Sequence, residues 1–224
     1  MVRLSGPSWL PRNGRSPQRL VVLLHGLGAD GNDLIGLAPA LARFLPDAAF
    51  HAPDAPFPCD FAPFGRQWFS LRAIDPAELA VAAWQGVERA APFLHEYLDH
   101  LLARYRLPAS CLGLVGFSQG TMMALHVAPR RDPGPAAVVG FSGALVAPER
   151  LAGELRSRPP VLLVHGDADE VVPLDYLFAA VHGLAAAGIP VQWLVRPGLG
   201  HAIDAVGLEA AGRFLRDLLV PASS

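Results

Sequence analysis

The chemistry in this sequence begins with a serine held between glycines, in the run Gly-Phe-Ser-Gln-Gly at 116–120. An apolar run over 112–115 precedes it and another over 121–125 follows it, which predicts a strand, a sharp turn and a helix. A serine at such a turn has a strained backbone and is exposed at the carboxyl end of its strand. The glycines allow strand and helix to approach closely. Ser118 is therefore the candidate nucleophile.

A second serine competes for this role. Ser142 lies in Gly-Phe-Ser-Gly-Ala at 140–144 and also follows an apolar run. It has alanine two residues later instead of glycine, and Pro148 follows soon after, so no long helix is expected to begin there. Ser118 is preferred for these reasons.

A serine hydroxyl is a weak nucleophile until a base takes its proton. Serine hydrolases with an open parallel sheet carry the three groups in the order serine, acid, histidine. Asp167 and Asp169 follow a late apolar run, and His201 lies in a glycine-rich loop further on. We expect Asp169 to reach His201 and Asp167 to cap the turn, with all three catalytic groups at the carboxyl edge of the sheet.

The glycine-rich segment 26–33 is interpreted as half of an oxyanion hole. It lacks the lysine and the glycine spacing of a phosphate-binding loop, and no bidentate glutamate follows as in a Ca²⁺ loop. The backbone N–H groups of Leu27 and Gln119 are the expected donors to a tetrahedral oxyanion. No metal or other cofactor is expected.

The other histidines and the cysteines have simpler interpretations. His25 and His165 end predicted strands and are expected to be structural. His126 and His182 fall on predicted helices and are expected to pack or to lie on the surface. His95 and His100 lie beside acidic residues and are expected to belong to a solvated helix face. Cys59 and Cys111 do not make a disulfide framework and are expected to be free thiols.

Apolar runs alternating with helical patterns indicate the elements that position these groups. Strands are expected over 19–25, 48–53, 112–117, 136–141, 161–165 and 190–195, and those at 19–25, 112–117 and 136–141 are expected to be buried. Helices are expected over 34–44, 76–105 with a kink or break at Pro92, 119–128, 148–155, 175–187 and 203–219. This alternation predicts an α/β fold, a mostly parallel, doubly wound sheet with helices on both faces. Residues 1–18 read as an irregular arm with room for one short edge strand, and residues 19–224 as a single domain.

Composition limits the function classes. The 224 residues are 52% hydrophobic and 17% charged, with a net charge of −2, so a nucleic-acid interface and an anionic membrane surface are not expected. The first eighteen residues have no apolar region of a signal peptide, and no apolar run reaches the roughly 18 residues of a membrane span. We expect a cytoplasmic protein with no stable membrane insertion.

The segment 53–72 is rich in proline and aromatic residues. Such a segment is either core beneath a long connection or the wall of an apolar pocket, and the sequence favours neither. As a pocket, it would bind an acyl chain together with apolar residues of the other loops. The expected pocket residues are Phe57, Phe61, Phe64, Trp68, Val171, Val172 and Leu199.

Taken together, the segments 25–31, 116–120, 165–173 and 200–201 resemble the phospholipase/carboxylesterase family of α/β-hydrolases, which includes acyl-protein thioesterases and bacterial carboxylesterases. The resemblance extends over about residues 19 to 219. It implies the α/β-hydrolase fold, and no insertion is long enough for a large cap domain. It also implies the triad Ser118, Asp169 and His201, the donors Leu27 and Gln119, and compatibility with a homodimer.

The expected function is that of a serine hydrolase that cleaves carboxylic esters or thioesters of short to medium acyl chains. Lysophospholipids and acylated proteins are candidate substrates. The alternatives are a dienelactone hydrolase-like enzyme, which typically carries cysteine at the elbow, and a peptidase, which often carries an extra domain. A non-catalytic binding module on the same fold usually lacks a member of the triad, whereas all three are present here.

Overall fold

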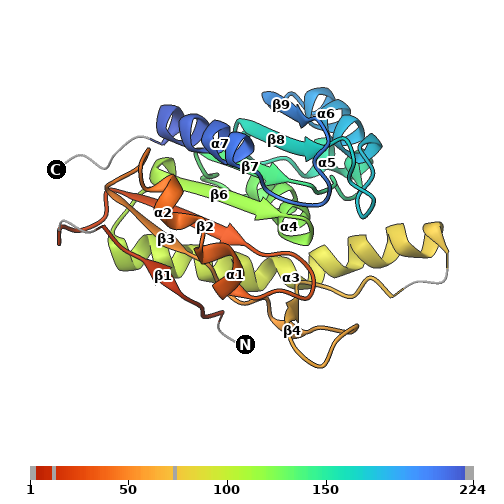
Figure 1. Ribbon diagram of the computed structural model, residues 1–224, viewed down its shortest axis with the longest axis horizontal. Coiled ribbons are helices and arrows are strands. Elements are labelled where there is room, and N and C mark those ends of the chain that lie inside the picture. Colours follow the sequence, from red (N-terminus) through yellow and green to blue (C-terminus); the bar gives the residue numbers. More distant parts are fainter. Residues whose placement is uncertain (1–3, 12–13, 73–74, 220–224) are drawn as a thin grey trace.

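The computed structural model describes residues 4–11, 14–72 and 75–219, which form a central sheet with helices on both faces (Figure 1). The seven strands lie in the order β1-β3-β2-β6-β7-β8-β9, and only the β1–β3 pair is antiparallel. Their bounds are β1 Ser8–Trp9, β2 Arg19–Leu24, β3 Ala48–His51, β6 Leu112–Phe117, β7 Ala137–Phe141, β8 Val161–Gly166 and β9 Val191–Arg196. The predicted α/β-hydrolase architecture is confirmed.

The helices divide between the two faces of the sheet. They are α1 Gly31–Ile35, α2 Ala38–Leu41, α3 Pro76–Tyr105, α4 Gln119–Val127, α5 Pro148–Glu154, α6 Asp175–Ala186 and α7 Ala205–Leu218. Short 3-10 turns follow α3 and α4 at Ala109–Cys111 and Ala128–Arg130. Helices α3 to α6 share one buried cluster with the sheet, and α1, α2 and α7 share the other.

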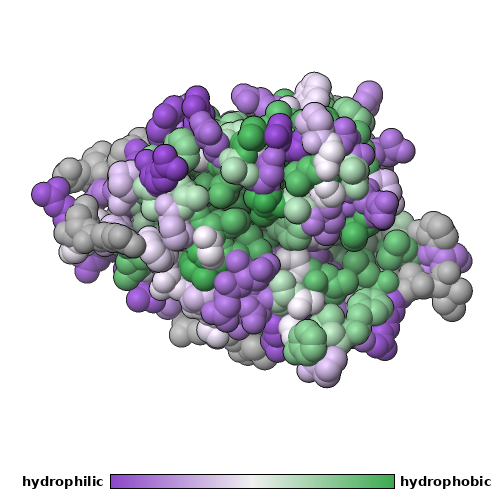
Figure 2. Space-filling model, viewed as in Figure 1, coloured by the Kyte–Doolittle hydropathy of each residue, from purple (hydrophilic) through white to green (hydrophobic). Residues whose placement is uncertain are grey.

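Burial on both faces explains why the strand sequences are continuously apolar. In β2, Val22 and Leu24 pack into the cluster beneath α3 and α4, while Val21 and Leu23 pack into the cluster beneath α1, α2 and α7. A parallel strand covered on both sides has no polar face, so its sequence does not alternate. Some apolar residues are also exposed at the surface. Figure 2 shows hydrophobic surface over the middle of the viewed face, bordered by hydrophilic residues.

Some elements differ from the sequence predictions. The predicted helix over 34–44 is two short helices, α1 and α2, and the residue that caps α1 is Asp30, whose side chain accepts from the Asn32 N–H. Helix α3 is a single element although Pro92 lies inside it. Part of the aromatic segment forms a two-stranded antiparallel hairpin, β4 Phe57–Pro58 with β5 Arg66–Gln67.

Candidate active site

Ser118 lies at a strained turn between β6 and α4. Its backbone angles are φ 53° and ψ −117°, in the positive-φ region that residues with a Cβ avoid. Two hydrogen bonds hold the turn, because the Ser118 N–H donates to the Phe141 carbonyl at 2.9 Å and the Ser118 carbonyl accepts from the Thr121 N–H at 2.9 Å. The structure thus forms the strand, turn and helix that the motif predicts.

The flanking glycines allow β2, β6 and α4 to meet. A Cβ placed on Gly120 would lie 1.9 Å from the Leu24 carbonyl oxygen, and one placed on Gly116 would lie 2.4 Å from the Thr121 nitrogen. Both distances are shorter than any tolerated contact, and the atoms met are backbone atoms that cannot rotate away. Glycine is therefore required at both positions for the reason that the sequence indicates.

The acid and the histidine meet at the carboxyl end of β8. His201 Nδ1 lies 2.8 Å from Asp169 Oδ2, and Asp169 Oδ1 accepts from the Val171 and Val172 N–H groups, each at 2.9 Å. Burial alone raises the pKa of the Asp169 carboxyl, but the hydrogen bonds from Val172, His201 and Val171 outweigh it and hold the pKa below its ordinary value. The carboxylate is therefore charged and oriented toward the imidazole.

His165 and Asp167 occupy neighbouring positions with different partners. His165 Nε2 lies 2.7 Å from the Val172 carbonyl oxygen and 3.4 Å from Asp169 Oδ2. A carbonyl only accepts, so this nitrogen carries a proton and presents a second donor near the carboxylate. Asp167 accepts from the Gly198 N–H at 2.6 Å and, within the described part of the chain, forms no hydrogen bond or ion pair with His201, as expected of a residue that caps the turn.

Ser142 is buried where Ser118 is accessible. Only 1% of Ser142 is exposed, and its hydroxyl has no hydrogen-bond partner among the residues that the structure describes. Ser118 is partly exposed and lines a cavity together with His201. Solvent access therefore favours Ser118 over Ser142 as the candidate nucleophile, in agreement with the sequence argument.

The cavity at Ser118 has a volume of about 540 Å³. Its lining includes the predicted residues Leu27, Gln119, Val171 and Val172. Its walls come from the first half of α3, the segment after β7 and the start of α6. The apolar wall residues that the sequence analysis did not identify are Leu71, Leu79, Ala80, Ala83, Met122, Ala144, Leu145, Val146, Ala147 and Pro148.

Five residues expected to bind substrate lie elsewhere. Phe61 and Phe64 are 60% and 74% exposed and lie outside the lining, and Phe57 lines a separate cavity beside the β4–β5 hairpin. Trp68 is fully buried in the core, and Leu199 is also absent from the lining. The cavity at Ser118 is therefore lined by other residues, and substrate binding by these five stays a prediction.

A sequence signal for this wall existed in α3. Leu79 and Ala83 continue, at a spacing of four residues, the apolar stripe that packs on the sheet from Val87 onward. The stripe is therefore longer than the part of α3 that covers the sheet, and its first turns line the cavity.

The charged groups at the cavity are few. Its ionisable lining residues are Glu149, Tyr176 and His201, and no lysine or arginine belongs to the described lining. Across the part of the chain that the structure describes, no group of three or more His, Cys, Asp or Glu side chains is placed to hold a metal ion.

His95, which was expected on a solvated helix face, contacts Arg131, with 3.1 Å between a ring nitrogen and a guanidinium nitrogen.

Comparisons with known proteins identify a family profile, related sequences and similar structures. The profile of the phospholipase/carboxylesterase family matches residues 11–219. Esterase YpfH of Escherichia coli (strain K12) is 30% identical over 200 residues, covering 89% of this chain and 82% of that protein. The crystal structure of esterase PE8 matches with a TM-score of 0.91 at 43% identity, covering 97% of this chain and 100% of that one.

A thioesterase structure is also similar. Acyl-protein thioesterase 2 of Zea mays matches with a TM-score of 0.73 at 25% identity, covering 96% of this chain and 100% of that one. The family profile spans nearly the whole chain, and the strained serine lies in the fold that the family shares. This chain therefore belongs to the phospholipase/carboxylesterase family of α/β-hydrolases and is an ester-cleaving serine hydrolase.

Proposed function

We propose that Ser118, Asp169 and His201 form the catalytic triad of a carboxylesterase or thioesterase. The observation that carries the proposal is the hydrogen bond of 2.8 Å between His201 and a carboxylate, in a cavity that also exposes a serine at a strained turn. The bond to Asp169 places the proton of the neutral imidazole on Nδ1, which leaves Nε2 free to accept the Ser118 proton.

The reaction then proceeds in two halves. Ser118 Oγ attacks the acyl carbonyl while His201 takes its proton, and His201 returns that proton to the departing alcohol or thiol. A water molecule, deprotonated by His201, attacks the acyl-enzyme and releases the acid. Asp169 stabilises the imidazolium in both halves without taking its proton.

The oxyanion of each tetrahedral intermediate is assigned to the backbone N–H groups of Leu27 and Gln119. Both residues line the cavity with Ser118, and neither N–H group donates to another group within the described ranges. Each such donor contributes about 3–4 kcal/mol of transition-state stabilisation in comparable enzymes.

The substrates proposed for this site are esters or thioesters of short to medium acyl chains. Apolar side chains dominate the cavity wall, which suits an uncharged acyl chain, and about 540 Å³ leaves room for several methylene groups. Lysophospholipids and acylated proteins carry such chains. Val171 and Val172 line this cavity and belong to the proposed acyl site, whereas Phe57, Phe61, Phe64, Trp68 and Leu199 lie outside its lining.

The alternative chemistries have less support. The elbow carries serine and not the cysteine typical of a dienelactone hydrolase, and the described chain contains no large inserted domain of the kind many peptidases carry. A binding module would not require Asp169 and His201 to be oriented as they are.

None of the helices in the described part of the chain combines the length and hydrophobicity of a membrane span. A cytoplasmic location, which the free thiols Cys59 and Cys111 favour, and a homodimer both stay predictions.

Hydrolysis of p-nitrophenyl esters with acyl chains of about two to twelve carbons tests the proposal. We expect wild type to show a maximum within the series, Ser118→Ala to lose activity by a factor of about 10⁴ or more, and Ser142→Ala to keep it. Activity retained by Ser118→Ala would remove the assignment of the nucleophile.

A further inference from the structure

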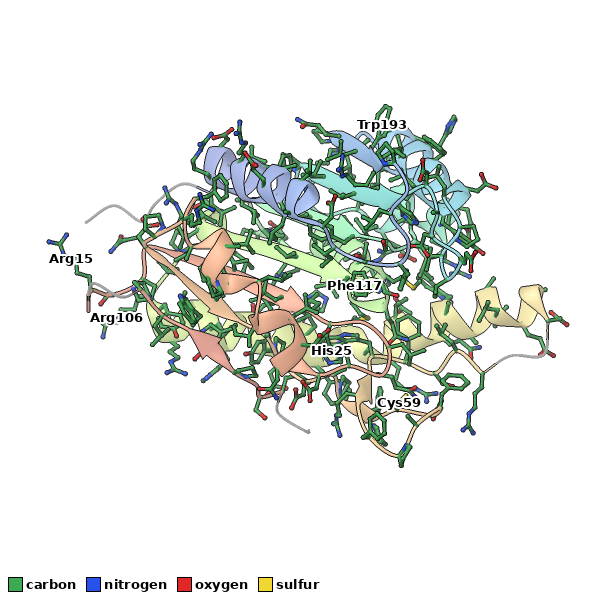
Figure 3. The ribbon with its side chains drawn as sticks, viewed as in Figure 1. Arg15, His25, Cys59, Arg106, Phe117 and Trp193 are labelled. Carbon is green, nitrogen blue, oxygen red and sulfur yellow. The ribbon has the colours of Figure 1, made fainter. Side chains whose placement is uncertain are left out.

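The peptide group between Gly26 and Leu27 is held from one side by a buried histidine. His25 Nδ1 lies 2.7 Å from the Gly26 carbonyl oxygen. In a trans peptide the N–H points opposite to the C=O, so a carbonyl directed at His25 turns the Leu27 N–H away from it. Ser118 lies nearby, because a Cβ built on Gly26 would be 3.3 Å from the Ser118 Cβ. Figure 3 shows His25 and Phe117 at the carboxyl ends of the paired strands β2 and β6.

The contacts of His25 are compatible with a single tautomer. The Gly26 carbonyl can only accept, so Nδ1 carries the proton, and Nε2 accepts from the Ala55 N–H at 3.0 Å. A proton on Nε2 would point at the Ala55 N–H group, so two donors would face each other. Burial lowers the pKa of His25, which keeps the ring in this neutral form.

Trp68 connects His25 to the second donor. Its indole N–H donates to the His25 carbonyl at 3.0 Å, and its ring lies 5.8 Å from the imidazole between centroids. The Trp68 backbone N–H donates to Gln119 Oε1 at 2.8 Å, and Gln119 Nε2 donates to the Phe69 carbonyl at 2.8 Å. All four side chains are buried, so these bonds are not exchanged with water.

We propose that His25, Trp68 and the Gln119 side chain form a brace that orients the two N–H donors of the oxyanion hole, with His25 as the positioning residue for Leu27. The proposal rests on the proposed function, since it assigns a role to groups around that site. The brace links the loop after β2 to the start of α4 through one tryptophan. An oxyanion donor must lie about 2.7–3.1 Å from the charge that develops, so small rotations of either peptide reduce its contribution.

Two replacements of His25 separate its contacts. In His25→Asn the amide nitrogen replaces Nδ1 and keeps the donor to Gly26, whereas in His25→Gln the amide oxygen replaces Nε2 and keeps only the acceptor for Ala55. His51→Gln is the matched control, because His51 is also buried but contacts the Tyr105 hydroxyl, away from the cavity. Trp68→Phe keeps an aromatic ring and removes the indole donor.

The assay measures kcat and KM on one p-nitrophenyl ester, with enzyme concentration set by fluorophosphonate labelling of Ser118. A trifluoromethyl ketone, which forms a tetrahedral oxyanion with a serine, reports on the donors without turnover. We expect His25→Gln and Trp68→Phe to lower kcat about 10- to 100-fold at nearly constant KM, and to raise the ketone inhibition constant by a similar factor. We expect His25→Asn and His51→Gln to stay within about threefold of wild type.

The outcomes separate the brace from the triad. Equal losses in His25→Gln and His25→Asn, or a loss of kcat with unchanged ketone affinity, would overturn the brace. Wild-type kcat in both His25→Gln and Trp68→Phe, with Ser118→Ala inactive, would overturn the brace and leave the triad intact. Activity in Ser118→Ala would remove the proposed function and the brace together.

Discussion

Replacing Asp169 with asparagine should reverse the tautomer of His201. The amide has one accepting oxygen and one donating nitrogen, whereas the carboxylate accepts on both sides. Its oxygen should stay with the Val171 and Val172 N–H groups, because turning the amide would leave the buried Val172 donor without a partner, at a cost of roughly 1–3 kcal/mol, and would also break the partly buried bond from Val171. The NH₂ group then faces His201 Nδ1 and makes that nitrogen the acceptor.

The proton of the imidazole consequently moves to Nε2, where it blocks proton transfer from Ser118. Loss of the correct tautomer lowers kcat about 10⁴-fold in other triads, which corresponds to about 5.4 kcal/mol of transition-state stabilisation. We expect a similar loss of kcat in Asp169→Asn, measured on a p-nitrophenyl ester near pH 8. KM should change little, because the acid does not contact the acyl chain in the cavity.

Asp167→Asn is the matched control for this experiment. Asp167 is two residues away and bonds to the Gly198 N–H, so the same isosteric change should keep kcat within about threefold of wild type. Thermal unfolding of both variants separates loss of chemistry from loss of fold. A loss below about tenfold in Asp169→Asn, or a larger loss in Asp167→Asn than in Asp169→Asn, would refute the assignment of the acid.

Three further predictions address the cavity, the elbow and the charge of the acid. Ala83→Phe should lower kcat/KM for long p-nitrophenyl esters by at least about tenfold more than for acetate, whereas Ala82→Phe, outside the cavity lining, should leave the length profile unchanged. Gly120→Ala should destabilise the fold by about 3 kcal/mol or more in urea unfolding, because its methyl group would lie 1.9 Å from the Leu24 carbonyl oxygen. The control is Gly153→Ala, in open space on α5, which should be neutral or stabilising by up to about 1 kcal/mol. Since the pKa of Asp169 is lowered in the fold, its carboxylate stabilises the protein above about pH 4, and this contribution is lost as pH falls through the lowered pKa. The difference in unfolding free energy between wild type and Asp169→Asn should therefore shrink toward acid pH, and a difference independent of pH would contradict the prediction.

The parts of the site that could be predicted from sequence are those whose determinants are local. The elbow depends on two glycines within five residues, and the acid lies in a turn directly after a buried strand. The carboxyl ends of parallel strands lie along one edge of the sheet, so the topology brings Asp169 and His201 near Ser118 without any knowledge of side-chain contacts. The burial of β2 and β8 follows in the same way from their continuous apolar runs.

The cavity could not be predicted in this way, because aromatic composition does not distinguish support from lining. Phe61 and Trp68 belong to one segment, yet one is mostly exposed and the other fully buried. Their difference depends on partners distant in sequence, since the Trp68 indole requires the His25 carbonyl as acceptor. The cavity wall instead comes from small and aliphatic residues of α3 and of the segment after β7, which resemble ordinary helix and loop residues in the sequence.

Gln119 shows why a catalytic motif can require a particular side chain that the reaction itself does not use. The proposed oxyanion contact uses only the backbone N–H, which any residue except proline supplies. The side chain of Gln119 nevertheless accepts from the Trp68 N–H and donates to the Phe69 carbonyl, so it satisfies two backbone groups of a segment that is about fifty residues away in the chain. An apolar residue of similar size would keep the N–H but leave these buried groups without partners, at about 1–3 kcal/mol each. The side chain of Gln119 therefore joins the start of α4 to the aromatic segment, while its backbone N–H is the donor proposed for the oxyanion.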